Sequence, residues 1–105
     1  MRIREPDGFS VDIFSIYWFG KETYFYGMPK NYGGLQAYKA EDVAIIDNNI
    51  GFKTVFFSKG DAKSVHHWDL IQESLLDDLL ELDETAYKRF VDILKSEGQL
   101  DDSFY

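Results

Sequence analysis

The chain has 105 residues, a formal net charge of −8 and no cysteine, which excludes disulfide frameworks and thiolate metal sites. A chain of this length is expected to form one domain that buries roughly two-thirds of its unfolded surface. Its 45% hydrophobic and 17% aromatic content is typical of a folded protein. The first residues lack the apolar segment of a secretory signal. No run approaches the roughly 20 apolar residues of a membrane span, so a cytoplasmic protein is expected.

The negative charge is concentrated in the C-terminal part of the chain. Residues 1–60 hold seven acidic and seven basic residues, whereas residues 61–105 hold twelve acidic residues against four basic ones, a difference of −8. Direct nucleic-acid binding relies on Lys and Arg against phosphate, so this distribution argues against it. It favours attraction to basic proteins and repulsion from anionic membranes.

The first 60 residues have the pattern of β-strands joined by turns. Strands are expected at residues 1–4, 9–19, 23–28, 43–47 and 52–58, whereas residues 35–42 are ambiguous. Within the second strand, apolar side chains occupy odd positions up to Ile13 and even positions from Phe14 onward. One extra residue flips such an alternation, so a β-bulge is expected between these two residues. The alternative is a strand that is covered on both faces beyond this point.

From residue 61 the hydrophobic period changes from two to 3.6, which predicts helices up to residue 98. The apolar stripe of the first helix comprises Trp68, Ile71, Leu75, Leu79 and Leu82. A second helix is expected to begin after Asp83, a favourable N-cap, and to end at Gly98. The apolar face of this second helix comprises Tyr87, Phe90, Val91 and Leu94.

The order of these elements predicts a single α+β domain. It would consist of an antiparallel β-meander of four or five strands followed by two C-terminal helices packed on one face. Residues 99–105 are expected to form a mobile tail, although Phe104 and Tyr105 are apolar enough to dock.

Four carboxylates, those of Asp69, Glu73, Asp77 and Glu81, follow one another at four-residue spacing. In a continuous helix they would be surface neighbours, each like-charge pair being unfavourable by roughly 0.2–0.5 kcal/mol. The simplest interpretation of this acidic ladder is a solvated helix face. The alternatives are a surface for a cationic protein and a cation site, although the spacing of an EF-hand loop is absent.

Apolar residues beside the ladder favour the protein-binding alternative. Leu70, Leu76 and Leu80 lie next to the acids, and apolar anchors among charges are typical of protein interfaces. A helix covered on both sides would instead bury these leucines. The candidate partner-binding residues are Asp69, Glu73, Asp77, Asp78, Leu80 and Glu81.

Other candidate sites are weaker. His66 and His67 are adjacent, so their side chains point in different directions and are poorly placed to bind one ion; a general base is the alternative to ordinary polar residues. The glycine- and lysine-containing loop at residues 27–34 fits neither the Walker nor the dinucleotide pattern. The aromatic residues at 17–19 and 24–26 are expected to be mainly core, with some rings free to anchor a protein or a sugar. No catalytic motif, metal site or cofactor is expected.

The acidic ladder with Asp78, together with the aromatic segment FSIYWFGKETYFYG, resembles the bacterial immunity proteins of toxin–immunity pairs. Those of contact-dependent growth inhibition and other polymorphic toxin systems are the most similar in character. The resemblance implies cytoplasmic binding to a basic toxin domain, often a nuclease, by covering its active site or a nearby surface. Two other functions remain open: an adaptor with a different protein partner, and a small-molecule binder or enzyme that uses His66 and His67.

Overall fold

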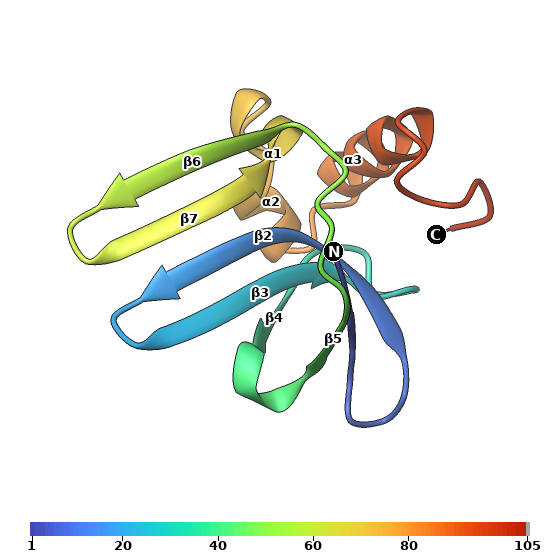
Figure 1. The fold of residues 1–105 in the computed structure, drawn as a ribbon. Helices are drawn as coiled ribbons and strands as arrows, with labels where there is room; N and C mark the ends of the chain where they lie inside the picture. The colour runs from blue at the N-terminus through green and yellow to red at the C-terminus, as the bar shows by residue number, and fades with distance from the viewer. Residues whose placement is uncertain (105) are drawn as a thin grey trace.

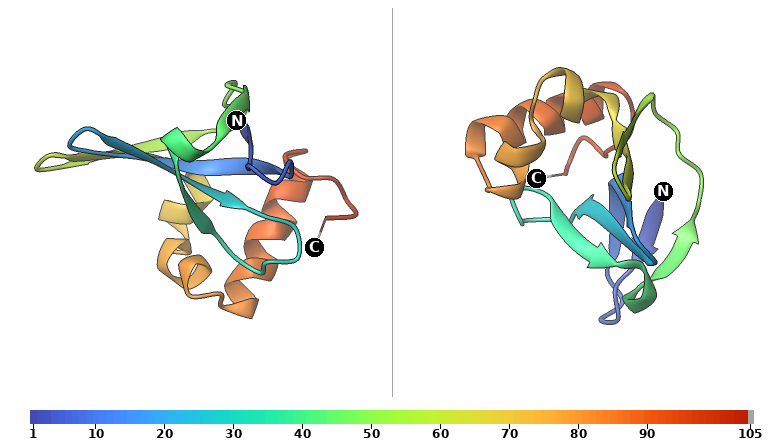
Figure 2. Two further views of the ribbon diagram at one scale, coloured as in Figure 1. Left: turned by 90° about the horizontal axis from the view of Figure 1, so that it is seen from below. Right: turned by 90° about the vertical axis from the view of Figure 1, so that its left-hand side faces the viewer.

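The protein, described over residues 1–104 of a computed structural model, has a curled antiparallel sheet with helices over part of one face (Figures 1 and 2). The strands are β1 (Arg2–Arg4), β2 (Ser10–Phe19), β3 (Glu22–Met28), β4 (Gln36–Lys39), β5 (Ala44–Asp47), β6 (Thr54–Lys59) and β7 (Ala62–His67). The helices are the 3₁₀-helix η1 (Ala40–Asp42), α1 (Trp68–Gln72), α2 (Leu76–Leu80) and α3 (Glu84–Ser96). The α+β class predicted from the sequence is confirmed.

Strand β2 is the centre of the sheet because it pairs with three other strands. One edge binds β3, while the other is divided: residues 10–12 pair with β1, and residues 15–19 pair with β7. The order is therefore β4-β3-β2-β1-β5, with β7 and then β6 attached to the second half of β2. The sheet is thus more than a simple meander, since β5 pairs with β1 and β7 returns to β2.

The β-bulge predicted in β2 is confirmed. Ile13 pairs with Gly27, but Ser15 pairs with Tyr26, so Phe14 is the extra residue on its strand. Because of this insertion, Ile13 belongs to one hydrophobic core while Phe14 belongs to the other.

The two cores lie on opposite faces of the sheet (Figure 2). The core within the curl of the sheet comprises Ile3, Val11, Ile13, Ile16, Phe25 and Tyr38. The core under the helices comprises Phe14, Met28, Leu35, Leu70, Leu75, Leu79, Ala86, Phe90, Val91, Leu94 and Leu100. The helices are therefore held to the sheet mainly by Phe14 of β2 and Met28 of β3, which pack against side chains of α1, α2 and α3.

The sequence-based prediction for residues 61–82 is wrong in two respects. Residues 62–67 form strand β7, and the first predicted helix is divided into α1 and α2. The division lies at Ser74, which has a φ of +55°, a left-handed conformation uncommon outside glycine. Leu82, which follows α2, also has a left-handed φ of +62°, and its side chain is exposed, although it was predicted to lie on the buried apolar stripe.

The second predicted helix is confirmed as α3. The Asp83 side chain accepts a hydrogen bond from the Ala86 N–H at 2.8 Å, and Gly98 has the left-handed φ of +74° expected after a helix end. The following segment is anchored, contrary to the expected free tail, because Leu100 is buried and Phe104 packs against the core under the helices. Tyr105 lies outside the described residues. Over residues 1–104, every helix is too short or too polar to cross a membrane.

Candidate functional site

The acidic ladder does not form a continuous surface, because the helix that would carry it is divided. Asp69, near the start of α1, is 0% exposed and is therefore removed from the predicted partner-binding set. Glu73 is exposed, but its carboxylate forms an ion pair with the guanidinium of Arg89 at 3.0 Å. Leu70 is also fully buried, so it belongs to the core and not to an interface.

The remaining predicted residues lie together on and beside α2. Five exposed side chains, three acids and two leucines, form a group that we call the α2 surface: Asp77, Asp78, Leu80, Glu81 and Leu82. Leu80 is 38% exposed and Leu82 46%, although leucine side chains usually contact a core. Sequence reasoning missed Leu82, because the helical period places it on the buried stripe.

A second exposed region consists of aromatic side chains at the free ends of two hairpins. The β2–β3 and β6–β7 hairpins extend beyond the helices (Figure 2). Their exposed rings are those of Trp18, Phe19, Phe56 and Phe57. This agrees with the expectation that part of the aromatic segment is open to solvent.

Tyr17 is a half-buried aromatic residue of β2. Its ring centroid lies 4.9 Å from that of Tyr26, on the side of the sheet that the helices cover. Burial raises the pKa of Tyr17, and the nearby Tyr26 and Asp77 raise it further. The carboxylate of Asp77 on α2 therefore lies near enough to Tyr17 on β2 to affect its pKa.

His66 is buried in a chain of three polar side chains. Its Nδ1 lies 2.8 Å from Ser15 Oγ on β2, and its Nε2 lies 2.9 Å from Ser64 Oγ on β7. Burial lowers the pKa of His66, which favours the neutral ring. A neutral imidazole has one donor and one acceptor, so one serine donates to it and the other accepts. Tyr17 packs edge-on against the ring at 5.1 Å, which leaves His66 no open face for a substrate.

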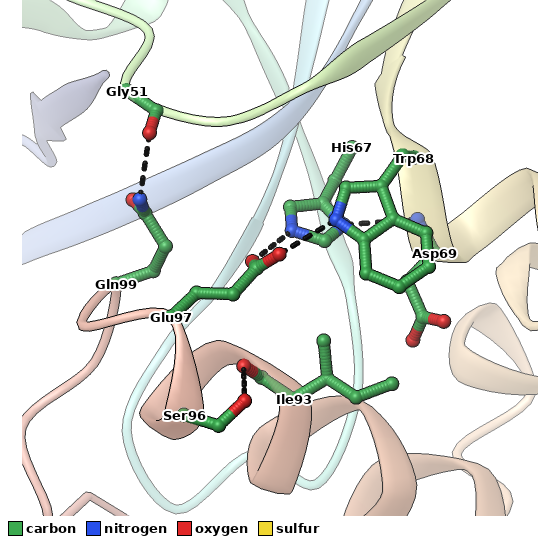
Figure 3. A network of polar contacts seen from close by, with 8 residues as sticks. All are labelled: Gly51, His67, Trp68, Asp69, Ile93, Ser96, Glu97 and Gln99. Carbon is green, nitrogen blue, oxygen red and sulfur yellow. Dashed lines mark hydrogen bonds and ion pairs between the residues drawn. The ribbon is translucent and has the colours of Figure 1, made fainter.

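His67 is fully buried and joins the sheet to the last helix (Figure 3). The Asp69 N–H donates to His67 Nδ1 at 3.1 Å, so this nitrogen carries no proton. The Nε2–H consequently donates to a Glu97 carboxylate oxygen at 2.7 Å. The Trp68 indole N–H donates to the second Glu97 oxygen at 2.6 Å. This arrangement fixes the tautomer of His67 and acts as a structural clamp.

The Asp69 carboxylate is an unusual buried group. Neither of its oxygens has a hydrogen-bond partner among residues 1–104. Burial raises the pKa of Asp69, and the nearby Glu73 and Glu97 carboxylates add to this effect, while His67 and Arg89 oppose it. A buried charge without hydrogen bonds is costly, so Asp69 is a local weakness in the fold.

The two histidines are less accessible than the α2 surface and the aromatic hairpin ends. Both histidines are enclosed and occupied by neighbouring side chains. Within residues 1–104 no three His, Asp or Glu side chains are grouped to hold a metal ion. The exposed features are instead the α2 surface and the aromatic hairpin ends. Comparison with protein families, with curated proteins and with solved structures finds no match to the chain.

Proposed function

We propose that the protein is an immunity protein that binds and neutralises a basic toxin domain, such as a nuclease, in the cytoplasm. The observation that carries this proposal is the α2 surface, where exposed carboxylates surround two exposed leucines. Acids alone are expected on many soluble proteins, whereas exposed leucines among acids have the composition of a binding surface.

The charges and the leucines would have different roles in binding. Asp77, Asp78 and Glu81 attract a cationic partner and accelerate encounter, with association rates up to about 10⁸–10⁹ M⁻¹s⁻¹ at low salt. Leu80 and Leu82 would fill apolar pockets of the partner and slow dissociation, since buried anchors carry most of the binding energy.

The charge distribution supports a basic partner. All of the net charge of −8 arises after residue 60, in the part of the chain that contains α2. A nuclease presents a cationic surface to phosphates, so an acidic protein that covers this surface blocks substrate entry. Inhibition by this route needs no catalytic group on the inhibitor, in keeping with the enclosed histidines.

The test uses paired charge reversals in affinity capture from the source cells. The wild-type protein, eluted from low salt by a salt gradient, is expected to retain a basic protein. The Asp77→Lys/Glu81→Lys variant should lose it. The control is Asp92→Lys/Asp102→Lys, which changes the net charge equally at exposed positions outside the α2 surface and should keep the partner.

The properties of the captured protein then show whether the partner is a toxin. A toxin should arrest growth when it is expressed alone, and co-expression with the wild-type protein should restore growth. A partner that is harmless, or that binds the two double variants equally, contradicts the immunity function and favours an adaptor. Binding unaffected by salt would likewise remove the α2 surface from the interface.

A further inference from the structure

Strand β6 is an open edge of the sheet. In the described part of the chain it pairs on one side only, with β7. It has the sequence TVFFSK, and its phenylalanines are exposed: Phe56 is 61% exposed and Phe57 is 47% exposed. Proteins usually protect such edges with proline, a bulge or charges within the strand, whereas β6 has a single charge, at its last residue.

We infer that β6 pairs with β6 of a second copy of the chain, forming an antiparallel dimer with one sheet running through both subunits. This inference is independent of the proposed function. In such a dimer the two-fold axis stands perpendicular to the sheet, and the same face of each copy points the same way. Residues that lie opposite each other must therefore share a face, so their numbers have the same parity.

Two registers align the strands most fully under this rule. In one, Phe56 lies on the axis, and Lys53 would oppose Lys59 of the other copy. In the second, Phe57 lies on the axis, Lys59 opposes Val55, and Lys53 comes level with Asp61 in the turn after the strand. Like charges directly opposite each other are destabilising, while opposite charges are favourable. The charges of the chain therefore select the register centred on Phe57.

This register also covers the exposed rings on both faces. Phe57 shares its face with His66, because its pairing partner Ser64 lies two residues from His66 on β7. On that face, Phe57 would meet its own symmetry mate. On the other face, Phe56 would oppose Ser58 and reach the second Phe56 diagonally, at roughly 7–8 Å. Pairs of aromatic side chains are among the stronger cross-strand contacts.

The net charge of the chain sets the salt dependence of the dimer. Two copies of charge −8 repel each other at long range, and added salt screens this repulsion. Dimerisation should therefore strengthen as salt increases, whereas binding to a basic partner should weaken. The two proposals can fail separately because these responses have opposite signs.

The primary experiment is sedimentation velocity of the full chain from micromolar to near-millimolar concentration, at low and at moderate salt. A concentration-dependent dimer that is favoured by salt supports the inference. A monomer throughout both series overturns it.

Charge variants then test the register. Phe57→Lys and Phe57→Glu each place two like charges on the axis, so each should be monomeric, while their mixture should form a heterodimer. Ile46→Lys, at an exposed position on the β5 edge, should dimerise as the wild type does. Circular dichroism confirms that each variant is folded. The Phe57-centred pairing would be contradicted if Phe57→Lys formed a homodimer, or if the mixture of the two variants formed no heterodimer.

Cross-linking gives a second measurement that does not depend on charge. Because the natural chain contains no cysteine, Phe57→Cys introduces a single thiol. Mild oxidation should yield a covalent dimer of Phe57→Cys much faster than of Phe19→Cys, although Phe19, on the neighbouring hairpin, is more exposed (62%) than Phe57 (47%). Equal rates for the two variants would overturn the inference.

Discussion

His67 Nε2 lies 2.7 Å from a carboxylate oxygen of Glu97, although the two residues are 30 positions apart. The contact joins the end of β7 to the C-cap of α3, and Trp68 donates to the same carboxylate. The side chain of His67 also packs edge-on against Phe14 and Phe90. One carboxylate therefore ties the C-terminal end of α3 to the end of β7.

Replacing this carboxylate should destabilise the whole domain. In Glu97→Ala the buried Nε2–H of His67 loses its acceptor, which should lower the free energy of unfolding by about 1–3 kcal/mol. Urea unfolding followed by circular dichroism measures the change. Asp92→Ala, an exposed acid on the same helix, serves as the control and should change stability by less than about 0.5 kcal/mol. Equal free energies of unfolding for the two variants would show that the contact of Glu97 with His67 and Trp68 does not stabilise the fold.

Asp69→Asn should stabilise the protein at neutral pH. Burial raises the pKa of Asp69 in the folded state above its unfolded value of 3.8. The folded state therefore binds more protons between these two pKa values, and stability falls as pH rises through this window. Asparagine removes the buried charge, so its advantage over aspartate should be larger at pH 7 than near pH 4. Urea midpoints at the two pH values measure this difference, and an advantage that grows toward acid pH would contradict the assignment.

Gly34→Ala should destabilise the protein because the loop before β4 touches α2 closely. The Leu35 N–H donates to the Leu79 carbonyl at 3.1 Å. A Cβ on Gly34 would overlap this carbonyl oxygen and lie 2.7 Å from Leu82 Cδ2. We expect a loss of about 1–3 kcal/mol, as for other overpacked sites.

Gly51→Ala is the matched control for this substitution, because its nearest neighbour, Gln99 Nε2, would lie at an ordinary 3.7 Å. Thermal unfolding of both variants distinguishes close approach from a general effect of replacing glycine. Similar melting temperatures for the two variants would argue against the close contact.

Two adjacent leucines on α2 should respond differently to truncation. Leu79 is fully buried, so Leu79→Ala should lower the free energy of unfolding by about 2–5 kcal/mol. Leu80 is exposed, so Leu80→Ala should leave stability within about 0.5 kcal/mol of the wild type. Under the proposed function, Leu80→Ala should also accelerate dissociation of the toxin, measured as a dissociation rate with one partner immobilised. A strong loss of stability in Leu80→Ala would mean that the side chain is core.

Local patterns were sufficient to predict several elements of the fold. The phase change between Ile13 and Phe14 predicted the bulge, because alternation reports directly which face a strand residue occupies. Asp83 and Gly98 predicted the ends of α3, since both residues act on the backbone next to them.

Strand β7 was missed because its buried positions are polar. Ser64 and His66 face the interior, and burial of the imidazole also relies on Ser15, a hydrogen-bond partner 51 residues away in the sequence. Hydrophobic alternation does not predict such a strand. Its residues were therefore assigned to the helix that follows.

The break between α1 and α2 was also invisible in the sequence, and it changed the candidate site. Ser74 and Leu82 adopt left-handed backbone without being glycine, so neither gives a stop signal. The regular spacing of the ladder implied equivalent acids, yet tertiary packing buries Asp69 and leaves Asp77 exposed. Among the candidate partner-binding residues, the exposure of those on and beside α2 was predicted correctly, whereas that of Asp69 was not.

The divided edge of β2 has a consequence for the order of events during synthesis. The half of this edge that holds residues 15–19 stays unpaired until β7, some fifty residues later, has been made. Contacts between such distant segments slow folding, and sheets of this kind commonly form in milliseconds to seconds. During that interval the nascent chain presents Trp18 and Phe19 beside free backbone groups. Residues 15–19 are therefore open to incorrect strand pairing until β7 has been made.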